Sequence, residues 1–168
     1  MRLILAAISM IIPAVATAQA VVTERSISAA AAQEAARVAM EQCRKEGHRV
    51  TVTVLDHAAR TKVVVRDDGA SPHSLQHSLN KAYTALTYRE PSGDYGKRAA
   101  ANFPASAGAL NLEKIATAAG GLPIRAGNDI VGAIGVSGSR GSPNAPGGAT
   151  DTKCAQAGID RIAPGLGG

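Results

Sequence analysis

The chain has 168 residues, carries a formal charge of +5 at neutral pH and is only 2% aromatic. This length suits a single domain whose core must be filled by Ala, Val, Ile and Leu side chains. The basic residues are spread along the chain and are not interleaved with aromatic residues, so the composition gives no support to nucleic-acid binding.

Residues 1–20 show the three-part pattern of a secretory signal. A basic second residue precedes an apolar run over residues 3–15, and small residues allow cleavage after Ala18 or Ala20. The alternative is a membrane anchor or a buried helix, but the apolar run is shorter than the roughly 20 residues that span a bilayer. We therefore predict a periplasmic or secreted protein, residues 21–168, with no stable membrane insertion after signal removal.

The first helix is predicted from Ser28 to about Glu46. Ser28 is a favourable N-cap, the segment is rich in alanine, and Gly47 is a typical stop. Two adjacent stripes of small or apolar residues can lie flat against a sheet: Ala31, Ala35, Val38 and Gln42, and Ala32, Ala35, Ala39 and Cys43.

Two strands should follow, over residues 48–55 and 61–66. The first alternates, with three valines on one face, and the second has Val63, Val64 and Val65 buried. Asp56-His57-Ala58-Ala59-Arg60 forms the turn between them.

A second helix is predicted to begin at Ser71-Pro72 and to end before Pro91, because serine caps a helix and proline is tolerated at its first position. Its pattern gives an apolar stripe of Leu75, Leu79, Ala82 and Leu86. The far side should carry the polar stripe of His73, His77, Asn80, Lys81, Thr84 and Tyr88.

The remaining chain centres on a hairpin. Strands over residues 122–126 and 129–136 are joined by Gly127-Asn128, which suits a tight turn. The second of these strands is so apolar that it belongs in the middle of a sheet. Its glycines, Gly132 and Gly135, indicate something packed very close to the backbone.

The segments around the hairpin are less regular. We predict one or two helical turns within 94–101, a further strand over 112–118, a flexible loop over 138–149, a last helix from Thr150 or Asp151 to about Ile162, and a frayed tail. The whole order predicts one α+β domain, an antiparallel sheet of about five strands with helices packed on it.

Motifs spread over most of the mature chain resemble the GlcG/HbpS-type haem-binding family, also called the haem-degrading domain. They are Arg66-Asp-Asp-Gly-Ala70, Ser74-Leu75 with Lys81-Ala-Tyr-Thr-Ala85, Gly120-Gly-Leu-Pro-Ile124, Gly132-Ala-Ile-Gly-Val-Ser-Gly138 and Asp151-Thr-Lys-Cys-Ala-Gln-Ala157. The resemblance implies a profilin-like fold, homo-oligomers, and roles in haem or corrinoid handling or in iron and redox sensing outside the cell. The chain departs from the family at Asp56-His57-Ala58-Ala59, where Asp-Ala-Gly-Gly is common.

The strongest site candidates are His73 and His77. Four residues apart on a helix, their rings share a face and can reach one metal or flank a flat cofactor. One imidazole can ligate haem iron, with Lys81 or Arg66 pairing with propionates. The alternative is that both are ordinary surface histidines.

Cys43 and Cys154 are the two cysteines, and export permits a disulfide between them; two buried free thiols are the alternative. No nucleophile elbow, zinc-protease motif or paired cysteine motif is present, so no catalytic residue is assigned. Ser137-Gly-Ser139 either presents backbone amides to an anion or simply turns the chain.

Three hypotheses remain open. The first is an exported binding protein for haem or iron, with no reaction of its own. The second is an enzyme acting on haem or on a small organic acid. The third is an oligomeric structural or sensory module that binds a partner protein.

Overall fold

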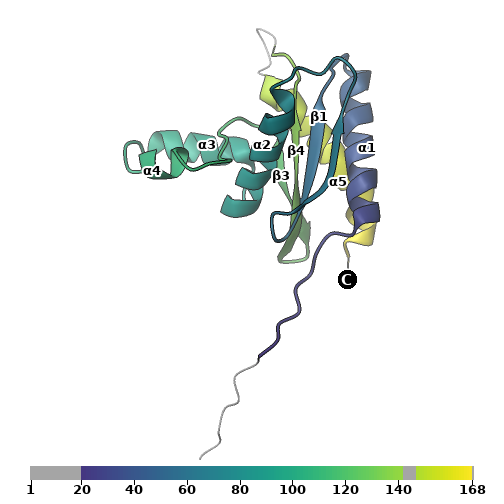
Figure 1. Cartoon of the computed structure of the whole chain (residues 1–168), viewed down its shortest axis with the longest axis horizontal. Coiled ribbons are helices and arrows are strands. Elements are labelled where there is room, and N and C mark those ends of the chain that lie inside the picture. Colours follow the sequence, from purple (N-terminus) through teal and green to yellow (C-terminus); the bar gives the residue numbers. More distant parts are fainter. Residues whose placement is uncertain (1–19, 142–146, 168) are drawn as a thin grey trace, which may run out of the picture.

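A computed structural model describes residues 20–141 and 147–167 (Figure 1). The elements follow in the order α1 (Ala29–Lys45), β1 (Thr51–Asp56), β2 (Thr61–Arg66), α2 (Ser74–Tyr88), α3 (Ser92–Ala101), α4 (Ala107–Leu110), β3 (Gly121–Ala126), β4 (Asp129–Ser137), α5 (Gly147–Ile162) and a 3-10 turn η1 (Ala163–Gly165). Most of the predicted signal and the middle of the predicted loop 138–149 lie outside the described residues.

The strands form one antiparallel sheet in the order β2-β1-β4-β3. Helices α1 and α5 cover one face and α2 covers the other (Figure 1). The predicted hairpin is confirmed as β3 and β4, and β4 lies in the interior of the sheet. The sequence prediction of an antiparallel α+β fold is therefore correct.

The predicted fifth strand over residues 112–118 is wrong, and the sheet has four strands among the described residues. This segment runs as turns and irregular chain, with Leu112 58% exposed. The backbone N–H of Ala116 donates to the Thr84 hydroxyl at 2.8 Å, which belongs to a helix. A side chain of α2 thus provides the hydrogen bond that a neighbouring strand would have supplied.

The predicted burial of all three β2 valines is also wrong. Strand β2 is an edge strand, so only β1 pairs with it. Val63 is partly buried against the core, whereas Val64 and Val65 are exposed. Three consecutive valines therefore reflect strand propensity at an edge, and not burial on both faces.

The first predicted helix is confirmed as α1. The Ser28 hydroxyl accepts a hydrogen bond from the Ala31 N–H at 3.1 Å, which caps the helix. The second predicted stripe, containing Ala32, Ala39 and Cys43, is fully buried, while Ala31 at the head of the first stripe is only partly buried. Because these side chains are small, α1 lies close to both the sheet and α5.

Helix α2 begins at Ser74, three residues after the predicted cap, because residues 71–73 form a turn. Its buried face agrees only in part with the prediction: Ala82 is buried, and Leu79 and Leu86 are partly buried against the core. Leu75 is 49% exposed, whereas the buried residues are mostly small or polar: Ser74, Ser78, Lys81, Ala82, Thr84 and Ala85.

Hydroxyl groups explain this orientation of α2. The Ser74 hydroxyl lies 2.8 Å from that of Thr51, and the Ser78 hydroxyl lies 2.8 Å from that of Thr53. Paired hydroxyls can be buried at little cost because each satisfies the other. The polar residues of β1 therefore face the polar residues of α2.

The close packing predicted at Gly132 and Gly135 is confirmed. A Cβ added at Gly135 would lie 2.1 Å from the Ser78 carbonyl oxygen and 2.7 Å from the Ala82 nitrogen. A Cβ at Gly132 would lie 2.4 Å from the Leu55 carbonyl oxygen. The close neighbour of Gly135 is α2, and that of Gly132 is the adjacent strand β1.

Replacing Gly135 by alanine is expected to lower the free energy of unfolding by about 1–3 kcal/mol, because the new methyl group must displace α2 from the sheet. Urea denaturation followed by circular dichroism measures the change. Gly108→Ala is the matched control, because a Cβ there meets no atom within 4 Å. An equal loss in both variants would contradict the close approach of α2 to β4.

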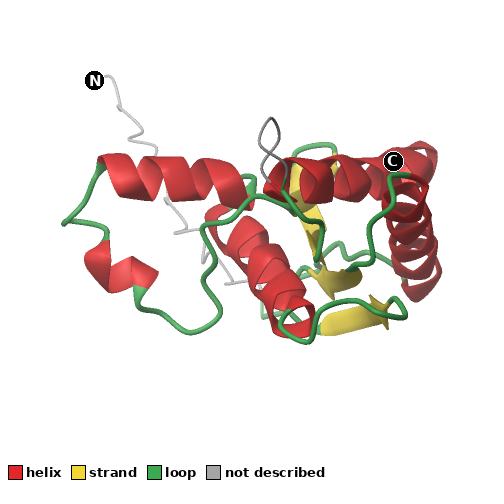
Figure 2. Ribbon diagram, turned by 90° about the horizontal axis from the view of Figure 1, so that it is seen from above, coloured by secondary structure: helices red, strands yellow, loops and turns green. Residues whose placement is uncertain are grey.

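Two further elements differ from their predictions. Helices α3 and α4 project from the α2 side of the sheet as an arm (Figures 1 and 2), where the sequence predicted one or two helical turns within 94–101. The last helix starts at Gly147, before the predicted cap, and the tail continues into η1, with Leu166 packed against the core.

Candidate functional site

A cavity of about 260 Å³ lies where β4 ends and α2 begins. Its lining residues come from α2, from the end of β4 and from the start of α5, and include Ser71, His73, His77, Lys81, Ser137 and Asp151. His77 also lines a neighbouring hollow of about 460 Å³ on the side of the arm. The predicted histidine pair therefore borders a hollow surface.

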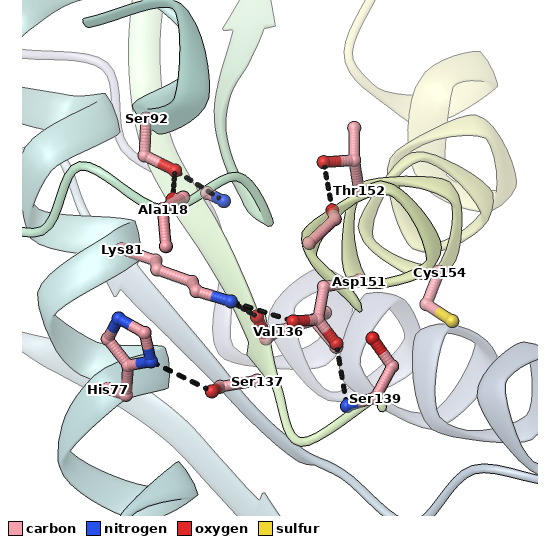
Figure 3. Close-up of polar contacts among 12 residues, drawn as sticks. His77, Lys81, Ser92, Ala118, Val136, Ser137, Ser139, Asp151, Thr152 and Cys154 are labelled. Carbon is pink, nitrogen blue, oxygen red and sulfur yellow. Dashed lines mark hydrogen bonds and ion pairs between the residues drawn. The ribbon is translucent and has the colours of Figure 1, made fainter. Parts of the chain in front are cut away.

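His77 is half-buried and held by β4. Its Nδ1 lies 3.3 Å from the Ser137 hydroxyl, and the other ring nitrogen is directed away from Ser137 (Figure 3). Burial lowers the pKa of His77 below its usual value of 6.5, and the nearby charges of Lys81 and His73 lower it further. The imidazole is therefore neutral at pH 7, the form that can ligate a metal.

His73 lies one helical turn earlier, at the N-cap position of α2, and is exposed. The centres of its ring and that of His77 are 6.4 Å apart, with the ring planes inclined by 45°. Both rings line the same cavity, so the sequence spacing placed them on a common face.

Lys81 is not an accessible residue of a polar stripe. Its side chain is 3% exposed, and its ammonium group donates to the Asp151 carboxylate at 2.7 Å and to the Val136 carbonyl at 3.0 Å (Figure 3). The charge of Lys81 is thus already matched inside the protein. Its ammonium group is therefore engaged by Asp151 and Val136, and we do not propose Lys81 as a partner for a ligand carboxylate.

Arg66 is exposed at the end of β2, where its guanidinium group donates to the Ala70 carbonyl. It does not line the histidine cavity. The backbone amide of Ser139, considered above for anion binding, donates instead to Asp151 at 3.1 Å. The ion pair of Lys81 and Asp151 therefore also anchors the chain just after β4.

The contact of Ser137 with His77 and the pairing of Asp151 with Lys81 are the features of the site that the sequence did not predict. Ser137 ends a strand and Asp151 lies 70 residues after its partner Lys81, so no local pattern joins either to α2. The available signal was that Lys81, Ser137 and Asp151 each belong to one of the motifs that resemble the family.

Two larger cavities lie elsewhere. One of about 620 Å³ lies between β3 and α5, and one of about 700 Å³ lies between α3 and the start of α5. Neither is lined by a histidine or a cysteine, so the smaller histidine cavity has the better chemistry for a metal-containing ligand.

Within the described residues, no three or more His, Cys, Asp or Glu side chains are grouped to hold a metal ion. In the same part of the chain, no helix has the length and apolar character needed to cross a membrane. Cys43 and Cys154 are joined by a disulfide between α1 and α5, with Cα atoms 5.6 Å apart.

The sequence over residues 27–160 matches the family described as haem degrading protein HbpS-like. The chain belongs to this family. An uncharacterized 15.0 kDa protein from the dhaT-dhaS intergenic region of Citrobacter freundii is 34% identical over 116 residues, which is 67% of this chain and 80% of that protein.

Solved structures support the same grouping. A double mutant of Streptomyces reticuli HbpS is 32% identical, with a TM-score of 0.75 over 90% of this chain and 97% of the other. The PduOC–haem complex is 23% identical, with a TM-score of 0.69 over 82% and 95% of the two chains, a likeness that shows the fold alone.

Proposed function

We propose that this HbpS-like protein is exported and binds haem or a similar tetrapyrrole, with His77 as the iron ligand. The observation that carries the proposal is a half-buried imidazole that lines a cavity and is held at Nδ1 by Ser137, with burial lowering its pKa. Ser137 can accept the proton of Nδ1, which leaves the lone pair of Nε2 for the metal. A hydrogen bond of this kind commonly orients metal-ligating histidines.

A porphyrin suits this site better than a bare metal ion. Two imidazoles do not complete the usual four-ligand set of a structural metal site. In haem the macrocycle holds the iron, and the protein adds one or two axial ligands. The family description, haem degrading protein HbpS-like, supports the same class of ligand.

Export is supported by the signal pattern of residues 1–20 and by the disulfide between Cys43 and Cys154. Disulfides persist in oxidising compartments such as the bacterial periplasm. Mass spectrometry of the protein recovered from a periplasmic extract tests this part. A full-length chain retaining Met1 would contradict it.

Haemin titration of the mature protein is expected to shift the Soret band, and His77→Ala should weaken binding at least about tenfold, because an axial bond is lost. The wild-type spectrum should stay constant from pH 8 to about 6.5, since the lowered pKa keeps His77 neutral across this range. His57→Ala is the matched control. Asp56, the residue before it, pairs with Gly132, at the opposite end of β1 from the cavity. Identical spectra for wild type and His77→Ala would exclude His77 as the ligand.

Oxidative haem degradation is the second candidate, favoured by the family description. Ascorbate added to the haem complex, without peroxide, should bleach the Soret band if the protein degrades haem. A Soret band that stays stable would contradict haem degradation and leave haem binding as the function.

Self-association, which the family resemblance implies, stays a prediction that sedimentation velocity of the mature protein would check.

A further inference from the structure

A second cavity, of about 280 Å³, adjoins the histidine cavity. Three loops form it: residues 47–49 after α1, residues 69–71 before α2, and residues 138–140 after β4. The two cavities share Ser71, Gly138 and Arg140 in their linings. A ligand held at His77 can therefore extend into the second cavity, because the two cavities border the same residues.

The second cavity is lined by cationic side chains and by no carboxylate. Arg49 and Arg140 are its charged residues, and His48 is its other titratable one. Arg140 is exposed and forms no ion pair with any residue in the described ranges. Within the part of the chain that the structure describes, no carboxylate therefore pairs with this positive charge next to the histidine cavity.

Arg49 is only weakly engaged. Its guanidinium lies 3.8 Å from the Asp67 carboxylate, and its side chain is 54% exposed. Arg44 already binds both oxygens of Asp67, at 2.7 and 2.9 Å. One buried carboxylate therefore serves two arginines, and the closer one takes both hydrogen bonds, which leaves donors of Arg49 free.

The backbone brings Arg49 to the end of β4. Gly138 has a φ of 129°, and a Cβ there would lie 2.7 Å from the Arg49 carbonyl oxygen. Only glycine tolerates both the conformation and the contact. The loop bearing Arg49 is therefore fixed against the loop bearing Arg140, beside the site of His77.

We propose that Arg49 and Arg140 bind a carboxylate of the ligand whose other end lies at His77. This proposal rests on the proposed function, because it assigns the propionate partners of a bound haem. Guanidinium groups suit this role, since their paired N–H donors match the two oxygens of a carboxylate. The same subsite would accept a free small carboxylate.

The test compares haemin with haemin dimethyl ester, whose propionates carry no charge. Wild type should bind haemin about tenfold more tightly than the ester. Arg49→Gln and Arg140→Gln should each weaken haemin binding by about threefold to tenfold and leave ester binding unchanged. The effect is moderate because both arginine side chains are exposed to solvent. The preference for haemin should also shrink as salt is raised.

Arg37→Gln is the matched control, because it removes the same charge from the outer side of α1, where Arg37 pairs with Glu34 and Glu41. It should bind both probes as wild type does. If wild type shifts the Soret band but binds both probes equally, the carboxylate subsite is wrong and haem binding stands.

If neither probe shifts the Soret band, the proposed haem function fails. The carboxylate subsite then needs a test that does not depend on haem. Titration with sodium propionate, followed through the NMR signals of the arginine Nε–H groups, should then shift Arg49 and Arg140 and leave Arg37 unmoved. Unmoved signals for Arg49 and Arg140 would overturn the subsite as well.

Discussion

Replacing Lys81 by methionine is expected to lower the free energy of unfolding by about 3–5 kcal/mol. The side chains of Lys81 and Asp151 are each 3% exposed, and their charged groups are 2.7 Å apart. The variant would leave the Asp151 carboxylate buried without its cation. Removing one partner of such a pair costs far more than the pair contributes when intact, because a buried charge loses its compensation. Urea denaturation of the mature protein measures the loss.

A second substitution separates the charge from the lost packing. Lys81→Met/Asp151→Asn removes both charges, and an asparagine oxygen can still accept the hydrogen bond from the Ser139 amide. This double variant should be more stable than Lys81→Met alone. Lys97→Met is the exposed control, because the ion pair of Lys97 with Asp94 lies at the surface and contributes less than about 1 kcal/mol. Wild-type stability in Lys81→Met would refute the buried pair.

The ion pair also positions the candidate site. Lys81 lies one helical turn after His77 and bonds to the carbonyl of Val136, next to Ser137. The same contacts therefore hold α2 against the end of β4 and keep Ser137 within reach of the His77 ring. We expect Lys81→Met to weaken haem binding through this displacement, although Lys81 touches no ligand in the proposed site.

Local signals made part of this fold predictable. Some signals affect only residues close to them in the sequence. They are the cap at Ser28, the glycine stop after α1 and the turn at Gly127-Asn128. The glycines of β4 were informative for a similar reason, because a glycine in a buried strand has few explanations besides close packing. These elements appear as the sequence indicated.

Helix α2 was harder because its burial is decided by long-range contacts. Leucine periodicity found only part of the buried face. Ala82 is buried and Leu79 and Leu86 pack against the core, but Leu75 is exposed. The rest of the buried face is polar, since Ser74 and Ser78 pack on Thr51 and Thr53 through paired hydroxyls. A scale of hydrophobicity treats such residues as exposed. The strand expected over 112–118 failed similarly, because the Ala116 N–H donates to Thr84 of α2, and no described strand pairs with the segment.

The sequence predicted the histidine pair of the candidate site but not the residues that contact it. The spacing of His73 and His77 survives in the structure, because it depends on helix geometry alone. The partners of His77 and Lys81 come from β4 and α5, and only the folded chain brings them together. The cationic loops with Arg49 and Arg140 were invisible for the same reason.

Removing the disulfide by Cys43→Ala/Cys154→Ala is expected to cost about 2–5 kcal/mol of stability and to lower Tm by roughly 5–20 °C. The bond joins residues 111 apart in sequence, so its loss frees a long loop in the unfolded chain. Both cysteines are fully buried, one in α1 and one in α5. Thermal unfolding followed by circular dichroism measures the shift.

Reduction provides the control for this last prediction. A phosphine reductant should lower the Tm of wild type toward that of the double variant and leave the variant itself unchanged. Thiol titration of denatured, unreduced protein from the periplasm should find no free thiol. Two free thiols there, with a Tm insensitive to reductant, would mean that Cys43 and Cys154 are not joined, and the chemical support for export would be lost with the bond.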